Sequence, residues 1–124
     1  MKIINTENAP KAIGAYSQGV EVGGMYYFSG QTGLDPTTME MGTDFQGQLD
    51  QIMNNIDALL KAEDLNRKNV VKTTIFLKDL ADFSAVNAAY ESYFEQPYPA
   101  RSCVEVSRLP KDALVEIEVI ACKN

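Results

Sequence analysis

The fold is decided by the stretch Val70-Val71-Lys72-Thr73-Thr74-Ile75-Phe76-Leu77, in which Lys72 carries the only charge. β-Branched and aromatic side chains favour the pleated backbone of a strand. A run of this length with so little polarity predicts a central strand, paired along both edges. The residues before and after it must therefore supply the other strands and the helices that cover them.

Both flanks of this strand show the apolar periodicity of a helix. Upstream, Thr43 and Gln46 fit a capping box, which predicts a helix over residues 44–63. Downstream, Asp82 can cap a second helix that ends before Pro97. The apolar positions at helical spacing are Phe45, Leu49, Ile52, Met53, Ile56, Leu59 and Leu60 in the first helix, and Phe83, Val86, Tyr90, Tyr93 and Phe94 in the second.

Four further strands complete the pattern. Gly23-Gly24 separates the first two, as the turn of a tight hairpin does, because glycine reaches positive φ freely. The order ββαβαββ predicts a single α+β domain over residues 1–124, with two helices on one face of a sheet. The four strands are expected at 20–22, 25–29, 101–107 and 114–122.

The composition excludes several kinds of chemistry. The 124 residues include no histidine, so Ser-His and Cys-His catalytic pairs and histidine-liganded metals are ruled out. Cys103 and Cys122 are too few and too far apart for a zinc knuckle or a CxxC redox pair. A net charge of −6 disfavours nucleic acid as a partner. Residues 1–8 contain no apolar run long enough for a signal peptide or a membrane span, so we expect a cytoplasmic protein that does not bind membranes.

Side-chain alternation along residues 114–122 separates two faces of that strand. One face is apolar and consists of Val115, Ile117, Val119 and Ala121. The other mixes carboxylates with apolar side chains and consists of Leu114, Glu116, Glu118, Ile120 and Cys122. Such a mixed face is either solvated or covered by a second subunit that encloses a polar pocket.

Three residues of the last two strands are candidates for catalysis. Arg101 follows Pro99 without an acidic neighbour in sequence, which suits a bidentate contact with a carboxylate. The alternative for Arg101 is an ion pair with Glu116 or Glu118. Cys103 is either a nucleophile whose pKa is lowered by Arg101 or a small buried hydrophobe. Glu116 either activates water or is a surface charge.

The last quarter of the sequence also contains a long and specific motif. It consists of Pro99-Ala100-Arg101-Ser102-Cys103-Val104-Glu105-Val106, Arg108-Leu109-Pro110-Lys111-Asp112 and Val115-Glu116-Ile117-Glu118-Val119. Shorter matching segments are Asn8-Ala9-Pro10, Ile13-Gly14-Ala15-Tyr16-Ser17-Gln18-Gly19, Ser29-Gly30-Gln31, Val71-Lys72-Thr73-Thr74 and Val86-Asn87-Ala88-Ala89-Tyr90. Together these segments closely resemble the RidA (YjgF-like) family over the length of the chain.

This resemblance implies a fold like that of Bacillus chorismate mutase, assembled as a homotrimer with a cleft at each subunit boundary. In such a sheet, residues 70–77 lie between the last two strands. The implied reaction is hydrolysis of 2-iminobutanoate and 2-iminopropanoate to 2-keto acids and ammonia, with no metal and no cofactor. These imines leak from pyridoxal phosphate enzymes, and their removal protects such enzymes.

The family's functional residues carry over onto matching positions of this sequence. Arg101 is implied to bind the substrate carboxylate together with the Gly30 N–H. The Cys103 backbone is implied to contact the imine nitrogen, and Glu116 to position the attacking water. The remaining implied residues line the cleft and are Tyr16, Ser29 and Asn87.

Three departures from the family pattern bear on the pocket wall. Ala15 stands where the family often has proline, and Gln96-Pro97-Tyr98 is shorter than in some members. Thr32-Gly33 replaces a common Ile-Pro, which is expected to loosen that loop.

Two other classes of function stay open at this point. One is a non-catalytic site for keto acids or other small carboxylates, and the other is a chaperone-like trimer surface that acts through its thiols. A ribonuclease role, which has been attached to the family, is disfavoured by the acidic composition and the missing histidine.

Overall fold

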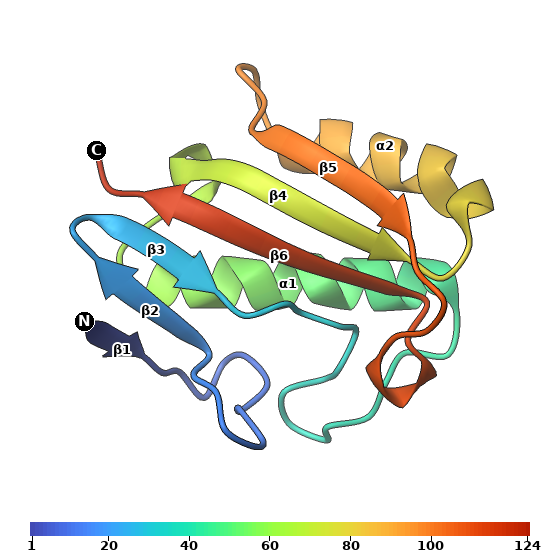
Figure 1. The fold of residues 1–124 in the computed structure, drawn as a ribbon, viewed down its shortest axis with the longest axis horizontal. Coiled ribbons are helices and arrows are strands. Elements are labelled where there is room, and N and C mark those ends of the chain that lie inside the picture. The colour runs from blue at the N-terminus through green and yellow to red at the C-terminus, as the bar shows by residue number, and fades with distance from the viewer.

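Six strands form one sheet in the order β1-β2-β3-β6-β4-β5 in the computed structural model, which describes residues 1–124 (Figure 1). Both helices lie on the same face of this sheet, behind it in Figure 1, and the opposite face is open. The strands are β1 (Lys2–Ile4), β2 (Gly19–Val22), β3 (Met25–Phe28), β4 (Val70–Leu77), β5 (Ala100–Glu105) and β6 (Val115–Cys122). The helices are α1 (Phe45–Ala62) and α2 (Phe83–Tyr93), with short 3₁₀ turns η1 (Arg67–Asn69), η2 (Leu80–Asp82) and η3 (Pro110–Asp112).

The predicted central strand is confirmed. β4 pairs antiparallel with β6 and parallel with β5, so it lies between the last two strands, as the family resemblance implied. Thr73, Ile75 and Leu77 point toward the helices and are buried, with exposed fractions of 1%, 0% and 0%. The apolar face predicted for β6 is confirmed as well, because Val115, Ile117, Val119 and Ala121 all belong to the core.

The two helices were predicted in the right places, but the cap of α1 was assigned to the wrong residue, and Asp82, which does occupy the N-cap position of α2, does not cap it through its side chain. Asp44, not Thr43, caps α1, since its carboxylate accepts the Gly47 N–H at 2.7 Å. Gln46 donates to Asp50 instead of closing a capping box. Adjacent Thr and Asp residues are both good N-caps, and the sequence pattern does not separate them.

At the second helix, the side chain of Asp82 makes no capping hydrogen bond. Asp79 caps the preceding turn η2 through the Ala81 N–H, and η2 leads directly into α2. The chain therefore enters α2 already coiled, and Asp82 has no free N–H to satisfy in the usual way.

One strand was not predicted. β1 pairs with β2 along the edge of the sheet, with Lys2 opposite Glu21 and Ile4 opposite Gly19. Three residues are too short a run to show alternation, so this pairing depends on tertiary contact and not on local pattern. The α+β class and the two helices on one face are confirmed, and the sheet is mixed, since β4 pairs parallel with β5 and antiparallel with β6. No helix here is long and apolar enough to cross a membrane.

We expect Asp44→Ala to lower the free energy of unfolding by about 1 kcal/mol, because the first turn of α1 loses its capping acceptor. Thr43→Ala is the matched control and should change stability by less than about 0.5 kcal/mol. Urea unfolding of both variants at one protein concentration measures the difference. Equal effects of the two substitutions would contradict the assignment of the cap.

Candidate active site

Glu116 lies beside a cavity of about 690 Å³ on the open side of β6. The same cavity is lined by Tyr16, Ser29 and Gly30, which the sequence placed in the cleft. We call these four residues the Glu116 half-site. Lys11 and Lys111 also line the cavity, and neither forms an ion pair with Glu116.

Gly30 is held against Glu116 by the residue that follows it. The Gln31 N–H donates to the Ile117 carbonyl at 2.8 Å, and the Ile117 N–H donates back to Gln31 at 3.0 Å. A Cβ on Gly30 would overlap the Glu116 carboxylate, with its Cδ only 2.9 Å away. Glycine is therefore required for Glu116 to occupy its position. The Gly30 N–H has no acceptor within the subunit.

The surroundings of Glu116 disfavour its charge. Burial raises the pKa of the Glu116 carboxyl above its usual range, and the like charge of Glu118 raises it further. A carboxylate that holds its proton more readily is a better base at a given pH above its pKa. Ser29 donates to the Ser17 carbonyl at 2.6 Å, so its hydroxyl is fixed beside the cavity.

Arg101 lies on β5, on the helix side of the sheet. Its Nη1 donates to Asn87 Oδ1 on α2 at 2.6 Å. Its guanidinium carbon lies 5.2 Å from the Phe83 ring centre and 5.0 Å from the Tyr90 ring centre, both within cation–π range. We call Arg101, Asn87, Phe83 and Tyr90, together with Cys103, the Arg101 half-site.

Arg101 forms no ion pair in the structure, so the alternative of a pair with Glu116 or Glu118 is wrong. Phe83 and Tyr90 were assigned to the helix core, and their role under Arg101 was missed. Their spacing to Asn87, at i, i+4 and i+7 on α2, was the available signal. An exposed arginine held by an amide and two rings retains free donors for a carboxylate.

Cys103 is half-buried opposite Ile75 of β4, and its side chain packs against the core. Burial raises the pKa of its thiol, and nearby Arg101 only partly offsets this. The reading of Cys103 as an activated nucleophile is therefore not supported. Because the Val106 N–H donates to Leu77, strand alternation directs the backbone N–H and C=O of Cys103 away from β4, toward the free edge of the sheet.

The two half-sites do not meet within one subunit. Arg101 is registered with Thr73, whose side chain faces the helices, whereas Glu116 is registered with Phe76 on the open face. The two Cα atoms are three residues apart along the strands and two strands apart across them, about 14 Å in all. The sheet itself separates the cation from the carboxylate.

Comparison with known proteins gives the family. The family model described as Endoribonuclease L-PSP matches residues 6–123. The 2-iminobutanoate/2-iminopropanoate deaminase of Escherichia coli K12 is 50% identical over 126 residues, which cover 99% of this chain and 98% of the relative. The chain belongs to the RidA (YjgF-like) family. The crystal structure of RidA from an Antarctic Psychrobacter has a TM-score of 0.96 at 43% identity, covering 99% of this chain and 100% of that one. The structure of E. coli TdcF with bound serine has a TM-score of 0.95 at 43% identity, covering 100% of both chains.

The loop at Thr32-Gly33, where the sequence departs from the RidA pattern, is held in place by hydrogen bonds and by packing. Asn55 of α1 donates to the Leu34 carbonyl at 2.9 Å, and Gly33 accepts the Gly42 N–H at 3.0 Å. A Cβ on Gly33 would approach the Gln48 Cα to 2.6 Å. The expected loosening is therefore offset by close packing of the loop on α1.

We expect Glu118→Gln to lower the pKa of the Glu116 carboxyl, because it removes the like charge that helps to raise that pKa. A carbon NMR titration of labelled carboxyl groups measures this, with Glu95→Gln as a control at an exposed carboxylate elsewhere. Where Glu116 must be ionised to act, activity falls as the pH drops through its raised pKa, and Glu118→Gln moves that fall to lower pH. An unchanged Glu116 pKa would contradict the electrostatic assignment.

Proposed function

We propose that this protein hydrolyses reactive 2-imino acids, 2-iminobutanoate and 2-iminopropanoate, to 2-keto acids and ammonia. The observation that carries the proposal is the pair of complementary half-sites: an arginine with no carboxylate partner, and a carboxylate whose pKa is raised. A 2-imino acid is itself a carboxylate next to an electrophilic carbon, so it needs one group of each kind. The E. coli relative that carries this activity in its name supports the assignment.

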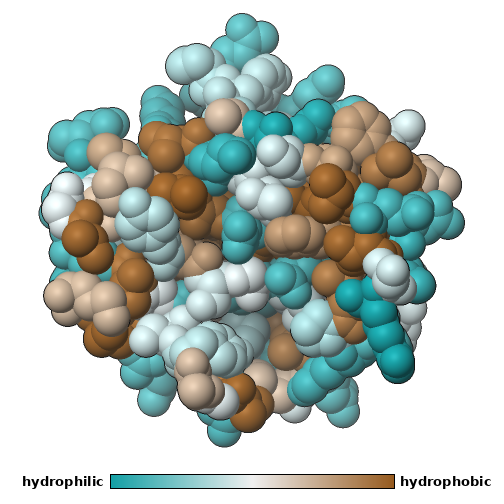
Figure 2. Space-filling model, in the orientation of Figure 1, coloured by the Kyte–Doolittle hydropathy of each residue, from teal (hydrophilic) through white to brown (hydrophobic).

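The active unit in this proposal is a homotrimer in which the Arg101 half-site of one subunit faces the Glu116 half-site of the next. Such an arrangement joins two groups that the sheet keeps apart in a single chain. Two features support it. β5 is an edge strand whose outer backbone groups have no partner in the subunit. The open face also shows apolar patches, which are brown in Figure 2. Tyr27 and Val104, which strand register places on that face, are each 45% exposed.

The proposed mechanism uses the chain's own groups. Arg101 and the Gly30 N–H bind the substrate carboxylate, and the Cys103 backbone carbonyl accepts a hydrogen bond from the protonated imine nitrogen. Tyr16, Ser29 and Asn87 line the cleft around the substrate. These contacts fix the orientation of the electrophilic carbon.

Glu116 then takes a proton from water as the water oxygen bonds to the imine carbon. Glu116 passes this proton to the nitrogen and then takes the proton of the new hydroxyl group as the C–N bond breaks. The 2-keto acid and ammonia leave, and the last proton returns from Glu116 to ammonia or water. A protonated imine is already electrophilic, and a thousandfold acceleration requires only about 4 kcal/mol. Positioning and one general base can supply that amount. We also propose that the reaction occurs in the cytoplasm, where it protects pyridoxal phosphate enzymes.

A second candidate is binding of a small carboxylate or amino acid without turnover. It is favoured by the related TdcF structure, which holds serine. In that case Arg101 is needed for binding, while Glu116→Gln leaves the function intact.

The test of the proposed function couples this protein to a threonine dehydratase and threonine, and traps free imine with semicarbazide. We expect the trapping rate to fall as the protein concentration rises, and the fall to vanish in Arg101→Ala and Glu116→Gln. Glu105→Gln, an exposed carboxylate of β5, is the control. If micromolar wild-type protein does not lower the trapping rate but still binds a keto acid, its function is binding of a small carboxylate without turnover.

The shared cleft makes a separate prediction about mixed assemblies. Arg101→Ala and Glu116→Gln subunits, each inactive alone, should regain activity when co-assembled, because some clefts then receive both intact groups. Random mixing in equal amounts leaves about a quarter of the clefts intact. The same trapping assay measures the recovery, and each variant assembled with itself is the control. Absence of any recovery in verified mixed trimers would mean that the two groups do not act across a subunit boundary.

A further inference from the structure

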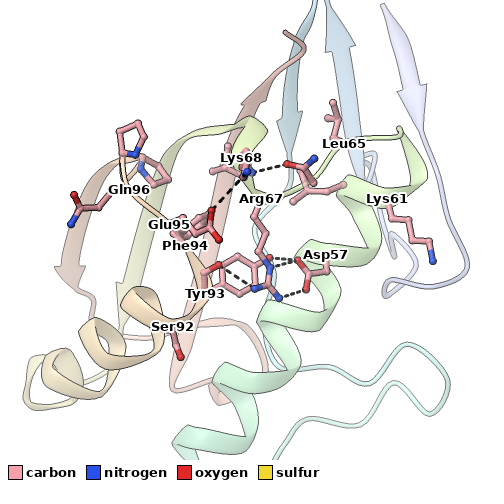
Figure 3. A pocket seen from close by; sticks show the side chains of 15 residues that line it. Asp57, Lys61, Leu65, Arg67, Lys68, Ser92, Tyr93, Phe94, Glu95 and Gln96 are labelled. Carbon is pink, nitrogen blue, oxygen red and sulfur yellow. Dashed lines mark hydrogen bonds and ion pairs between the residues drawn. The ribbon is translucent and has the colours of Figure 1, made fainter.

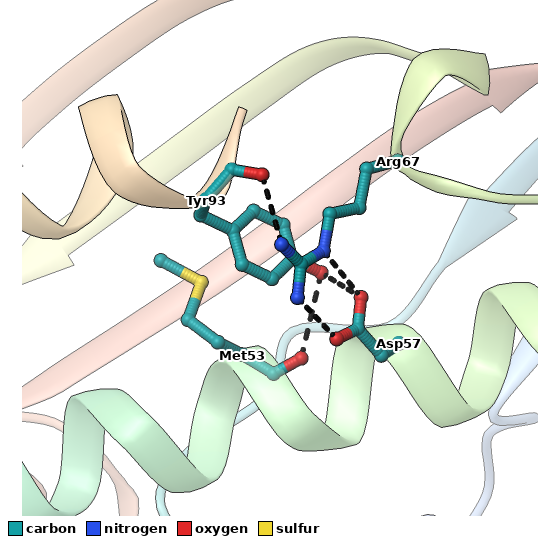
Figure 4. Close-up of polar contacts among 4 residues, drawn as sticks. All are labelled: Met53, Asp57, Arg67 and Tyr93. Atoms are coloured by element: carbon teal, nitrogen blue, oxygen red, sulfur yellow. Dashed lines mark hydrogen bonds and ion pairs between the residues drawn. The ribbon is translucent and has the colours of Figure 1, made fainter. Parts of the chain in front are cut away.

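A second arginine, Arg67, makes contacts unlike those of Arg101. It lies in η1 beside a cavity of about 790 Å³ between α1 and the segment that leads from α2 to β5 (Figure 3). Its donors point into the protein. Nε and Nη2 bind the Asp57 carboxylate of α1 at 3.1 and 2.8 Å, and Nη1 donates to the Tyr93 carbonyl at 3.1 Å (Figure 4).

The side chain of Tyr93 also contacts both Arg67 and Asp57. Its ring lies under the guanidinium, with the Arg67 Cζ 3.8 Å from the ring centre, and its hydroxyl donates to Asp57. Burial and the hydrogen bond to Asp57 raise the pKa of the Tyr93 phenol, so it stays a neutral donor. Tyr93 is the last residue of α2, and a cation at its carbonyl also complements the helix dipole. Arg67 therefore fixes the end of α2 to α1.

From Tyr93, aromatic rings continue in contact toward Arg101. Tyr93 packs edge-on against Phe94, and Phe94 packs against Tyr90, each pair with ring centres 4.7 Å apart. Tyr90 in turn lies under the Arg101 guanidinium and bonds through its hydroxyl to Thr73 at 3.1 Å. All three rings are buried, at 8%, 5% and 6% exposure for Tyr93, Phe94 and Tyr90. A tightly packed series of this kind has little freedom to absorb a shift at one end.

We infer that Arg67 is a positioning residue for Arg101, acting through the series Tyr93–Phe94–Tyr90. The same helix also carries Asn87, which holds the Arg101 Nη1, so the placement of α2 sets both contacts of the guanidinium. This inference rests on the proposed function only for its kinetic consequence. The placement of Arg101 can be observed without turnover.

The test compares Arg67→Met with Arg67→Lys and with the control Lys2→Met. Lys2 likewise pairs with a carboxylate, Glu63, at 2.7 Å, but at the β1 edge of the sheet. Three quantities are measured on the assembled protein: the nitrogen NMR signal of the Arg101 guanidinium, assigned with Arg101→Lys; the Kd for 2-oxobutanoate by calorimetry; and kcat and KM from imine trapping.

We expect Arg67→Met to shift the Arg101 signal and to raise the Kd and KM roughly threefold to tenfold, with kcat nearly unchanged. Arg67→Lys should have a smaller effect, because an ammonium keeps the charge but lacks the planar fork. Lys2→Met should change none of these quantities. A residue that only stabilised the fold would lower the unfolding temperature and leave KM where it was.

A separate control tests whether the effect of Arg67 on Arg101 passes through the aromatic rings. Phe94→Leu interrupts the series, and Arg67→Met added to it should then have less effect on the Kd than it has alone. If Arg67→Met fails to fold, Arg67→Lys and Phe94→Leu decide the question by the same signals. An unmoved Arg101 signal and an unchanged Kd in folded variants would overturn the inference.

The two proposals fail in distinguishable ways. If the wild type lowers the rate of imine trapping but Arg67→Met leaves the Arg101 signal and the Kd unchanged, the positioning role is wrong and the deaminase function stands. If the wild type leaves the trapping rate unchanged but Arg67→Met still shifts the Arg101 signal, the deaminase function is wrong and the positioning role stands.

Discussion

The two-residue period of the β-strand determines both the core of this protein and the placement of its candidate site. Across β5, β4 and β6 it directs Thr73 and Arg101 toward the helices and Phe76 and Glu116 toward the open face. The same alternation that builds the core therefore divides the candidate active site. A register shift of one residue would place Arg101 and Glu116 on other faces, but it would also expose the apolar face of β6. Site and core cannot be changed independently.

Arg67 and Arg101, the two arginines on the helix side of the sheet, have different partners and therefore different roles. Arg67 has its carboxylate within the subunit, and each of its three nitrogens donates a hydrogen bond, two to Asp57 and one to the end of α2. Arg101 has rings and one amide but no carboxylate. Partial desolvation by Phe83 and Tyr90 strengthens an anion contact without neutralising the charge. The contrast separates a structural cation from one that is available to a ligand.

Much of this architecture follows from local pattern, because a strand such as 70–77 and the apolar face of β6 are set by side-chain period. The failures have physical causes. Thr43 and Asp44 are equivalent caps in sequence, and only the path of the chain selects Asp44. β1 has only three residues, and it is a strand because it pairs with β2. Arg101, Cys103 and Glu116 were named as one site, yet pairing register, which local sequence does not contain, decides which faces they occupy.

In the proposed trimer, a cleft divided between subunits would change the surroundings of both Arg101 and Glu116. Arg101 is exposed at a free sheet edge, where water screens its attraction for a carboxylate. Covering that edge with the open face of another subunit would exclude water from the guanidinium and from Glu116 together. The attraction for the substrate carboxylate then strengthens, while burial raises the pKa of the Glu116 carboxyl and the facing Arg101 cation lowers it. The proposed assembly would therefore strengthen the binding of the substrate carboxylate by removing water, and it would leave the pKa of Glu116 set by burial on one side and the Arg101 charge on the other.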